Sequence, residues 1–400
     1  MLRYELKKVF SKRVNCIILL LIMLMALVFS AFAISSVDFV GQNGVSHKGI
    51  GAARSLSEVK NMYKGYITTK VVHDVILKDK LLNEKYNYAG DGTVPDKIYA
   101  KSLQSQNDIE DMTNQIICGD GEFDPYALLK ISSKQSNSIY ALREANIQGY
   151  INKYGKTKEQ KKFLKVQYQK NKTPFYYEAA DSWKTMYLYA ETYSLVLIVL
   201  IGFLASGIFA DEFKLQADAI FFSTKYGRTK AVRSKIASGI IMSTIVYWMG
   251  IGLLSAISFA VMGIGGAGVT TLVGETYQIY SVSFMQEYLI IVLCGYIASI
   301  LSASVAMLVS AKLHSSSIAV CIPFLLFCVS PFIGRVLPFK TCFYLTPDQL
   351  VNVMNCIKIP LIYQFGNVVF RQIPFITILY LLISIGLLPL IYQSYHRYAK

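Results

Sequence analysis

Six long apolar blocks, separated by polar stretches, dominate the pattern along the chain. They cover residues 14–34, 192–210, 236–262, 288–311, 315–334 and 373–392, and none contains an internal Lys, Arg, Asp or Glu. A helix of roughly 20 apolar residues crosses the hydrocarbon core of a bilayer. Because backbone groups cannot stay unpaired there, runs of this length indicate helices, whereas a barrel would show short alternating strands. The pattern predicts an all-α membrane protein with six transmembrane helices.

The composition agrees with this class. Of the 400 residues, 54% are hydrophobic and 16% are charged, whereas soluble domains carry about a quarter charged residues. The mean hydropathy is +0.40. The seven cysteines show no metal-ligand spacing. Cys342 and Cys356 share the last link and could pair, which the sequence leaves open.

The formal net charge of +15 is distributed unevenly over the links between the blocks. Basic residues precede the first block, follow the sixth, and fill the links after the second and fourth: Arg3, Lys7, Lys8, Lys12, Arg13, Lys214, Lys225, Arg228, Lys230, Arg233, Lys235, Lys312, His314, His396, Arg397 and Lys400. The opposite short link, 263–287, has no Lys or Arg. The positive-inside rule therefore puts both termini in the cytoplasm of a multi-pass cell-membrane protein, and we expect a bacterial plasma membrane. Topology and lipid headgroups explain the basic residues, so no nucleic-acid partner is expected.

A cleaved signal peptide is the alternative interpretation of the first block. Ala31, Phe32 and Ala33 resemble a cleavage site behind a basic start. The apolar run is longer than the usual signal sequence, and its loss would leave the basic C-terminus outside. We therefore favour a transmembrane helix.

Between the first two blocks lies a polar, Lys-rich stretch, 35–191, which we expect to form a large, mainly helical extracytoplasmic domain. Helical patterns cover 56–86, 97–117 and 138–168. Val72, Ile76, Leu77 and Leu81 recur at helical spacing and predict a face that packs on the domain itself or on a partner protomer. The remaining parts are a cytoplasmic amphipathic segment, 1–13, a cytoplasmic link, 211–235, and four spans within 236–400, with an external link over 335–372.

The first thirteen residues have an amphipathic pattern. Leu2, Leu6, Val9 and Phe10 fall on one helical face, and Arg3, Lys7 and Lys8 turn away from it. This predicts an interfacial helix whose residues Arg3, Lys7, Lys8 and Phe10 meet membrane lipid. The alternative is a charge cluster that only sets topology.

The 211–235 segment, together with the two residues before it, carries the most information about function. Phe213, Ala217, Ile220 and Phe221 recur at i, i+4, i+7 and i+8 and predict an amphipathic helix that Gly227 ends. A surface helix between two spans can transmit force to both of them. An ordinary helix that anchors the loop to the membrane surface explains the pattern equally well.

This segment resembles the coupling helix of type 2 ATP-binding-cassette (ABC) exporter permeases. The resemblance rests on an acidic residue, an amphipathic turn, Ser-Thr, Tyr-Gly-Arg and a closing lysine: Glu212, Ser223, Thr224, Tyr226, Gly227, Arg228 and Lys235. Many members have a Gly where this chain has Gln216 and Ala217, and a smaller first external loop. The short apolar stretch 361–365 resembles the external re-entrant helices of that family.

The resemblance implies a permease that docks on a cytosolic ABC ATPase subunit and pairs with a second permease copy, identical or related. The ATPase-coupling residues would then be Glu212, Phe213, Ala217, Ile220, Phe221, Tyr226, Gly227 and Arg228. The cargo expected is hydrophobic or amphiphilic, such as a lipid, a drug or an antimicrobial peptide. The alternative is a membrane sensor or scaffold of an ABC-type assembly that moves no substrate.

The sequence offers little catalytic chemistry. It contains no Gly-x-x-x-x-Gly-Lys-Ser/Thr motif, no His-x-x-x-His pair and no Gly-x-Ser-x-Gly elbow. We therefore expect no enzyme activity, metal or cofactor in this chain, with ATP bound by the partner subunit. Glu191 and Glu287 fall at the ends of spans, where an interfacial carboxylate is favoured over an ion-binding role.

Overall fold

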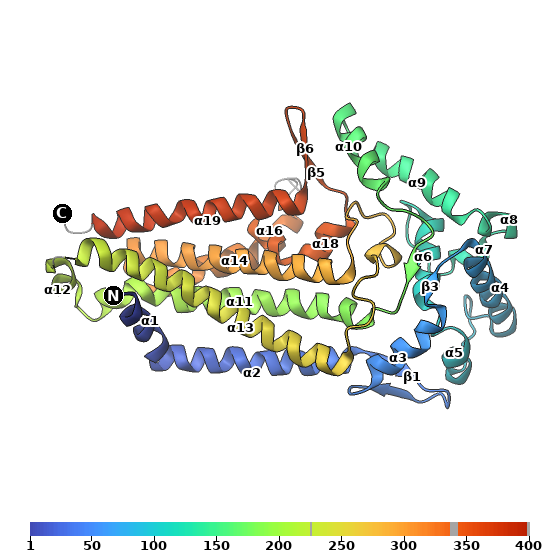
Figure 1. Ribbon diagram of the computed structural model, residues 1–400, viewed down its shortest axis with the longest axis horizontal. Helices are drawn as coiled ribbons and strands as arrows, with labels where there is room; N and C mark the ends of the chain where they lie inside the picture. Colours follow the sequence, from blue (N-terminus) through green and yellow to red (C-terminus); the bar gives the residue numbers. More distant parts are fainter. Residues whose placement is uncertain (225, 337–342, 398–400) are drawn as a thin grey trace.

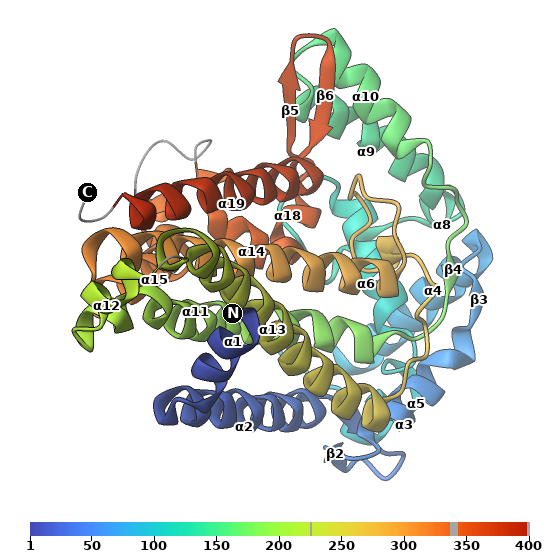
Figure 2. The same cartoon turned by 60° about the vertical axis from the view of Figure 1, so that its left-hand side comes forward.

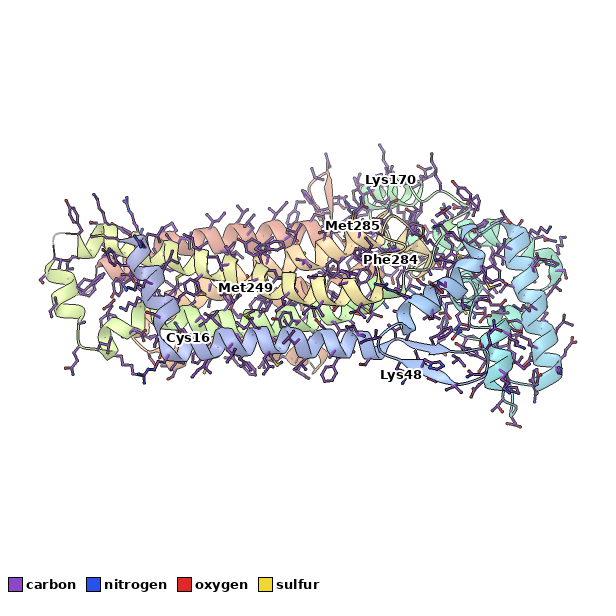
Figure 3. All side chains as sticks on the ribbon, turned by 60° about the horizontal axis from the view of Figure 1, so that its bottom comes forward. Cys16, Lys48, Lys170, Met249, Phe284 and Met285 are labelled. Carbon is purple, nitrogen blue, oxygen red and sulfur yellow. The ribbon has the colours of Figure 1, made fainter. Side chains whose placement is uncertain are left out.

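The computed structural model describes residues 1–224, 226–336 and 343–397, and in these residues it is mostly helical. Six helical segments are long and apolar enough to cross a membrane. They are α2 (Arg13–Ser36), α11 (Asp181–Lys214), α13 (Val232–Met262), α14 (Phe284–Leu313), the segment that begins with α15 (Ser316–Phe324), and α19 (Gln372–His396). The prediction of a mostly helical chain with six helices long and apolar enough to cross a membrane is confirmed. Figure 3 shows apolar side chains such as Met249 projecting from the spans along their length.

The fifth span is interrupted. After α15 the chain forms a π-helical turn, η4 (Leu325–Val329), and continues as α16 (Ser330–Val336). Pro331 has no backbone N–H to donate, and its ring would crowd the carbonyl four residues earlier. A widened turn immediately before Pro331 accommodates both effects.

Helix α11 is the centre of the bundle and packs against α2, α13, α14 and α15. Small residues allow the helices to approach closely. A Cβ at Gly295 would lie 2.4 Å from the Tyr247 hydroxyl oxygen, and Ser302 donates to the Ile198 carbonyl across the helix interface at 2.8 Å. Without a hydrophobic driving force in lipid, such close packing and hydrogen bonding hold helices together.

The two ends of the bundle differ (Figure 1). Helix α1 (Leu2–Ser11) and the C-terminal end of α19 lie at one end, which we call the terminal end. The polar domain, residues 37–180, covers the other, which we call the domain end. Here Arg54 donates to the carbonyls of Val261 and Ala260 at the last turn of α13, at 2.9 and 2.6 Å.

The polar domain contains a series of short helices and two small pairs of strands. In chain order its elements are β1 (Asp38–Val40), β2 (Ser46–Lys48), α3 (Ala52–Lys60), η1 (Asn61–Tyr63), β3 (Gly65–Tyr66), α4 (Thr69–Tyr86), α5 (Asp96–Ser102), α6 (Asn107–Cys118), α7 (Ala127–Lys130), α8 (Ser133–Ser136), α9 (Ile139–Tyr154), α10 (Lys158–Tyr168) and β4 (Tyr176–Tyr177). Strands β1 and β2 pair with each other, as do β3 and β4, both antiparallel. Each of the three helical stretches predicted from the sequence is split into two helices.

The domain has its own apolar core. Val72, Val75 and Ile76 of α4 pack with Ile109 and Met112 of α6. Of the predicted face, Val72 and Ile76 are buried in this core, whereas Leu77 and Leu81 are exposed in the single chain, so packing of these two on a partner protomer stays a prediction. The buried face of α4 runs through Val72, Val75 and Ile76, the positions that α6 covers.

The link before the last span differs from the sequence prediction. It contains η5 (Pro347–Val351), the short helix α18 (Val353–Lys358), and an antiparallel hairpin of β5 (Ile362–Phe365) and β6 (Val368–Arg371). The stretch 361–365, expected to be part of a re-entrant helix, is thus mainly a strand. Figure 2 shows the hairpin beside α10, where Thr157 donates to Gln364 at 2.7 Å. A pairing of Cys356 with Cys342 lies outside the described residues.

Candidate functional site: the 211–235 segment at the terminal end

The amphipathic helix that the sequence predicted before Gly227 is broken into two parts. Helix α11 continues to Lys214, and Gln216 then adopts a positive φ of 53°. A left-handed residue is a common way for a helix to end. A separate helix, α12 (Asp218–Ser223), follows, and a π-helical turn, η2 (Gly227–Ala231), leads into α13.

One side of this segment packs on the end of α19. Tyr395 is buried, and its ring centroid lies 4.7 Å from that of Phe209, 5.0 Å from Phe222, and 5.8 Å from both Phe213 and Phe221. Phe213 and Phe221 therefore face the bundle together although the helix between them is broken. We call these five aromatic residues the Tyr395 cluster.

The Gly-Arg corner is attached to the same helix. The Arg228 guanidinium donates to the His396 carbonyl at 3.5 Å, and His396 Nδ1 lies 2.8 Å from the Arg228 carbonyl oxygen. Arg228 also lies over the ring of Phe222, 5.1 Å from its centroid. A Cβ at Gly227 would lie 1.9 Å from the Phe221 carbonyl oxygen, so this tight corner requires glycine.

Glu212 lies inside the protein, although the resemblance would place it among residues that meet a partner. Its carboxylate is 2.6 Å from the Lys8 ammonium and 2.7 Å from the Lys235 ammonium. Lys235 also contacts Glu5, at 3.1 Å, and donates to the Ile208 carbonyl at 3.2 Å. These charges join α1, α11 and α13, and we call Glu5, Lys8, Glu212 and Lys235 the Glu212 cluster.

Helix α1 is amphipathic, as predicted, but its apolar side meets protein. Val9 is buried and Phe10 packs against the core of the bundle. Arg3 and Lys7 are exposed, while Lys8 is held by Glu212 and Lys12 by Asp211, at 2.8 Å. The membrane-surface role of Arg3, Lys7, Lys8 and Phe10 stays a prediction.

The tip of the segment exposes apolar side chains. Ile220 is 72% exposed and Leu215 is 67% exposed, and Tyr226 is partly exposed beside Lys230. Ala217 is half-buried. Figure 1 shows α12 at the extreme terminal end of the molecule. Ile220 therefore does not share the bundle-facing side with Phe213 and Phe221, contrary to the predicted helical face.

The region that most nearly resembles a phosphate-binding loop is not built like one. Gly155, Lys156 and Thr157 follow Gly149 with one residue too many for the motif. They lie between α9 and α10, where Thr157 accepts a hydrogen bond from the Gln160 amide as an N-cap. A phosphate-binding loop of this kind follows a strand, whereas Gly155 follows a helix.

The two carboxylates at span ends are both buried within the protein, and their interfacial position stays a prediction. Glu191 accepts a hydrogen bond from the Met354 amide, at 2.6 Å, at the start of α18. Glu287 lines a cavity at the domain end. No group of three His, Cys, Asp or Glu side chains that could hold a metal occurs within the described residues.

A comparison of the chain with protein-family models, curated proteins and solved structures finds no match.

Proposed function

We propose that the chain is the transmembrane permease subunit of an ABC exporter of type 2, coupled to a separate cytosolic ATPase subunit. The observation that carries the proposal is the two-sided construction of the 211–235 segment. Its tip exposes Leu215 and Ile220 beyond the bundle, while its inner side is fixed to α19 by the Tyr395 cluster. An exposed apolar tip on a firmly anchored element suits a docking surface that also transmits movement.

In this mechanism the ATPase contacts the tip through Leu215, Ile220 and Tyr226. Closure of the ATPase dimer on ATP displaces α12, and the displacement reaches α19 through Phe221 and Arg228. The Glu212 cluster moves α1, α11 and α13 with it, because its charges bridge all three. Packed interfaces switch between discrete arrangements rather than deforming continuously, so a small push can change which side of the pathway is open.

The orientation follows from the same proposal. The terminal end carries the basic links, so it lies in the cytoplasm and the polar domain lies outside. A second permease copy completes the pathway, and lipid surrounds the remaining apolar faces. A plasma membrane is the expected location.

Replacing Ile220 by Asp tests the docking surface. A tagged chain purified from native membranes is expected to retain a nucleotide-hydrolysing partner. The Ile220→Asp variant is expected to retain at least about tenfold less of this partner, which corresponds to a loss of about 1.4 kcal/mol in binding free energy. Ile50→Asp is the matched control, because Ile50 is also an exposed isoleucine, at 88%, but lies in the polar domain. Retention of the partner by Ile220→Asp, or its absence from the unchanged chain, contradicts the proposal.

A sensor that moves no substrate is the second candidate, and the length of α11 favours it. This one helix runs without interruption over 34 residues, from the polar domain to Glu212. At about 1.5 Å per residue it spans roughly 50 Å, long enough to carry a signal between the two ends. Proteoliposomes separate the candidates, since a permease couples ATP hydrolysis to flux and a sensor hydrolyses ATP without it.

A further inference from the structure

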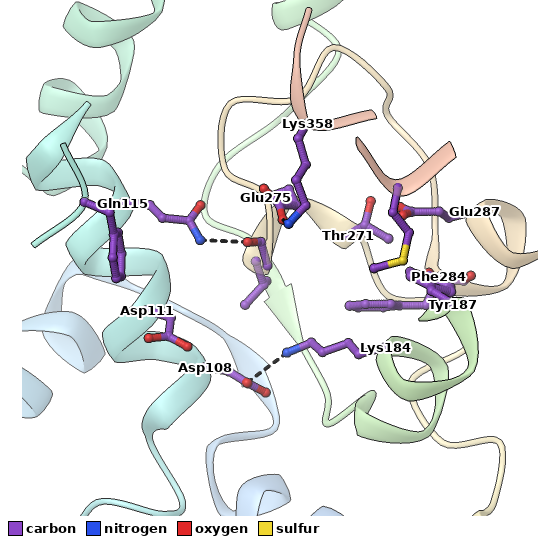
Figure 4. Close-up of a pocket in the computed structure, with 14 residues that line it drawn as sticks. Asp108, Asp111, Gln115, Lys184, Tyr187, Thr271, Glu275, Phe284, Glu287 and Lys358 are labelled. Atoms are coloured by element: carbon purple, nitrogen blue, oxygen red, sulfur yellow. Dashed lines mark hydrogen bonds and ion pairs between the residues drawn. The ribbon is translucent and has the colours of Figure 1, made fainter. Parts of the chain in front are cut away.

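A cavity of about 380 Å³ lies at the domain end, where the polar domain meets the spans (Figure 4). Its lining comes from α6 of the polar domain and Phe123 after it, the domain ends of α11 and α14, the 271–275 segment, which begins with the 3-10 helix η3 (Thr271–Val273), and α18. This volume falls in the range of small-molecule sites, about 300–1,000 Å³. Such sites commonly occur where two structural units meet.

Most of the charged side chains in the lining neutralise one another. Asp108 lies 2.8 Å from Lys184 and 3.1 Å from Lys60, and accepts a hydrogen bond from Tyr177 at 3.0 Å. Glu275 pairs with Lys358 at 2.8 Å. These two carboxylates therefore have no charge left to offer a ligand.

Two further carboxylates in the lining have no such partner. Glu287 is 5% exposed, and its Oε2 has no hydrogen-bond partner among the described residues. Asp111 lines the opposite wall from α6 and forms no ion pair with a described residue. Figure 4 shows Glu287 extending from α14 towards the other lining side chains. A buried carboxyl oxygen without a donor loses solvation and gains nothing in return, so its presence in a cavity indicates a missing partner.

Aromatic rings form another part of the wall. Tyr187 and Phe284 stack with ring centroids 6.1 Å apart, and the Tyr187 hydroxyl donates to the Phe284 carbonyl. Since the hydroxyl is already used, the rings present an apolar surface to the cavity. Aromatic faces attract ammonium and guanidinium groups.

We propose that this junction cavity binds an organic cation, an ammonium or guanidinium group on an apolar body, with Glu287 and Asp111 as its charge partners. The Tyr187 and Phe284 rings receive the apolar body. A metal ion fits less well, because Ca²⁺ needs about six to eight converging oxygens and the described residues contain no group of three suitable ligands. This site goes beyond the permease role and does not depend on it.

Equilibrium dialysis of the purified full-length chain tests the proposal with 2-phenylethylammonium as the probe. We expect saturable binding that the neutral analogue 2-phenylethanol does not reproduce. Glu287→Gln keeps the shape of the side chain and is expected to weaken binding at least about tenfold, the range of a charge-assisted hydrogen bond. Asp111→Asn, at a more exposed position, is expected to weaken binding about threefold as a screened charge.

Asp120→Asn is the matched control, since Asp120 is another surface carboxylate of the polar domain outside the cavity. It is expected to leave binding unchanged. The proposal is overturned if the probe shows no saturable binding, if the alcohol binds equally well, or if Glu287→Gln and Asp111→Asn both bind like the unchanged chain. Displacement of the probe by millimolar Ca²⁺ at the same residues, with Ca²⁺ binding more tightly, would replace the organic cation by a metal.

Discussion

The ammonium of Lys235 lies 2.7 Å from the carboxylate of Glu212, and Lys235 is completely buried. Removing one partner of a buried pair leaves an uncompensated charge, which typically costs about 3–5 kcal/mol. Lys235 keeps Glu5 and the Ile208 carbonyl, so we expect Glu212→Ala to lower the free energy of unfolding by about 3 kcal/mol. Unfolding of the purified chain in detergent measures this.

The neighbouring carboxylate provides a matched control. Asp211 pairs with Lys12 in a more exposed position, so Asp211→Asn is expected to lower the free energy of unfolding by less than about 1 kcal/mol. Replacing both members of the buried pair, as in Glu212→Gln with Lys235→Met, should recover at least half of the loss. If Asp211→Asn and Glu212→Ala lower the free energy of unfolding equally, the buried ion pair of Glu212 does not stabilise the protein more than the exposed pair of Asp211.

The six spans could be predicted from the sequence because uninterrupted apolar runs have few alternative structures. The Glu212 cluster could not, since Lys8 and Glu212 are 204 residues apart and no local pattern relates them. The break at Gln216 also had no local signal, because glutamine is a good helix former. It is tertiary packing of Phe213 and Phe221 on Tyr395 that favours the break.

One error had a visible signal. Gly366 and Asn367 stand between two short runs of β-branched and aromatic residues, which is a two-residue hairpin pattern. The resemblance to re-entrant helices favoured a helix at this position instead of the hairpin. The cavity at the domain end was not predictable, because its lining comes from five distant parts of the chain.

The buried ring of Tyr395 is expected to stabilise the terminal end of the bundle. Tyr395→Ala removes a buried ring that contacts four phenylalanines, and we expect a loss of about 3–5 kcal/mol in unfolding free energy. We also expect it to disconnect ATP hydrolysis in the assembly from movement of α19. Tyr392→Ala is the control, because Tyr392 is only half-buried and stacks on His396 at the edge of the bundle. If both variants behave alike, the Tyr395 cluster has no special role.

Asp108 makes the polar domain sensitive to acid. Burial alone would raise the pKa of Asp108, but the ammonium groups of Lys184 and Lys60 outweigh it and hold the pKa well below its usual range. The stabilisation is therefore present above the ordinary carboxyl pKa and is lost as the pH falls towards the folded value. Asp108→Asn is expected to cost about 3 kcal/mol at pH 7, and this difference from the unchanged chain should shrink in acid. Asp120→Asn, in an exposed pair with Lys153, should match the unchanged chain throughout.

Glu110 and Asp79 have the opposite effect. Burial, followed by the charge of Asp79, raises the pKa of Glu110 to about 9, and burial raises the pKa of Asp79 to about 6. Unfolded Glu110 releases its proton near pH 4.5, whereas folded Glu110 keeps it until about pH 9. The unfolded state binds fewer protons in between, so the free energy of unfolding falls as the pH rises.

Glu110→Gln replaces the titratable carboxyl group by a neutral amide and should therefore reduce the pH dependence of the free energy of unfolding. Between pH 5 and pH 8 we expect the free energy of unfolding of the unchanged chain to fall by at least about 1 kcal/mol more than that of the variant. Glu122→Gln is the control at an exposed site of the same domain. Parallel curves for Glu110→Gln and the unchanged chain would mean that Glu110 does not hold the proton.

The orientation of the chain decides whether the tip can reach a cytosolic partner. Ile220 and Val45 are exposed at opposite ends of the molecule, one in α12 and the other in the turn between β1 and β2. After replacement of Cys16 and Cys321, which are the exposed cysteines among the described residues, and of the remaining native cysteines, each position can carry a single new cysteine. In intact cells a membrane-impermeant maleimide should modify Val45→Cys and leave Ile220→Cys unmodified, and in inside-out vesicles the pattern should reverse. Modification of Ile220→Cys in intact cells would place the tip outside, where no ATPase could act on it, and the coupling mechanism would have to be abandoned.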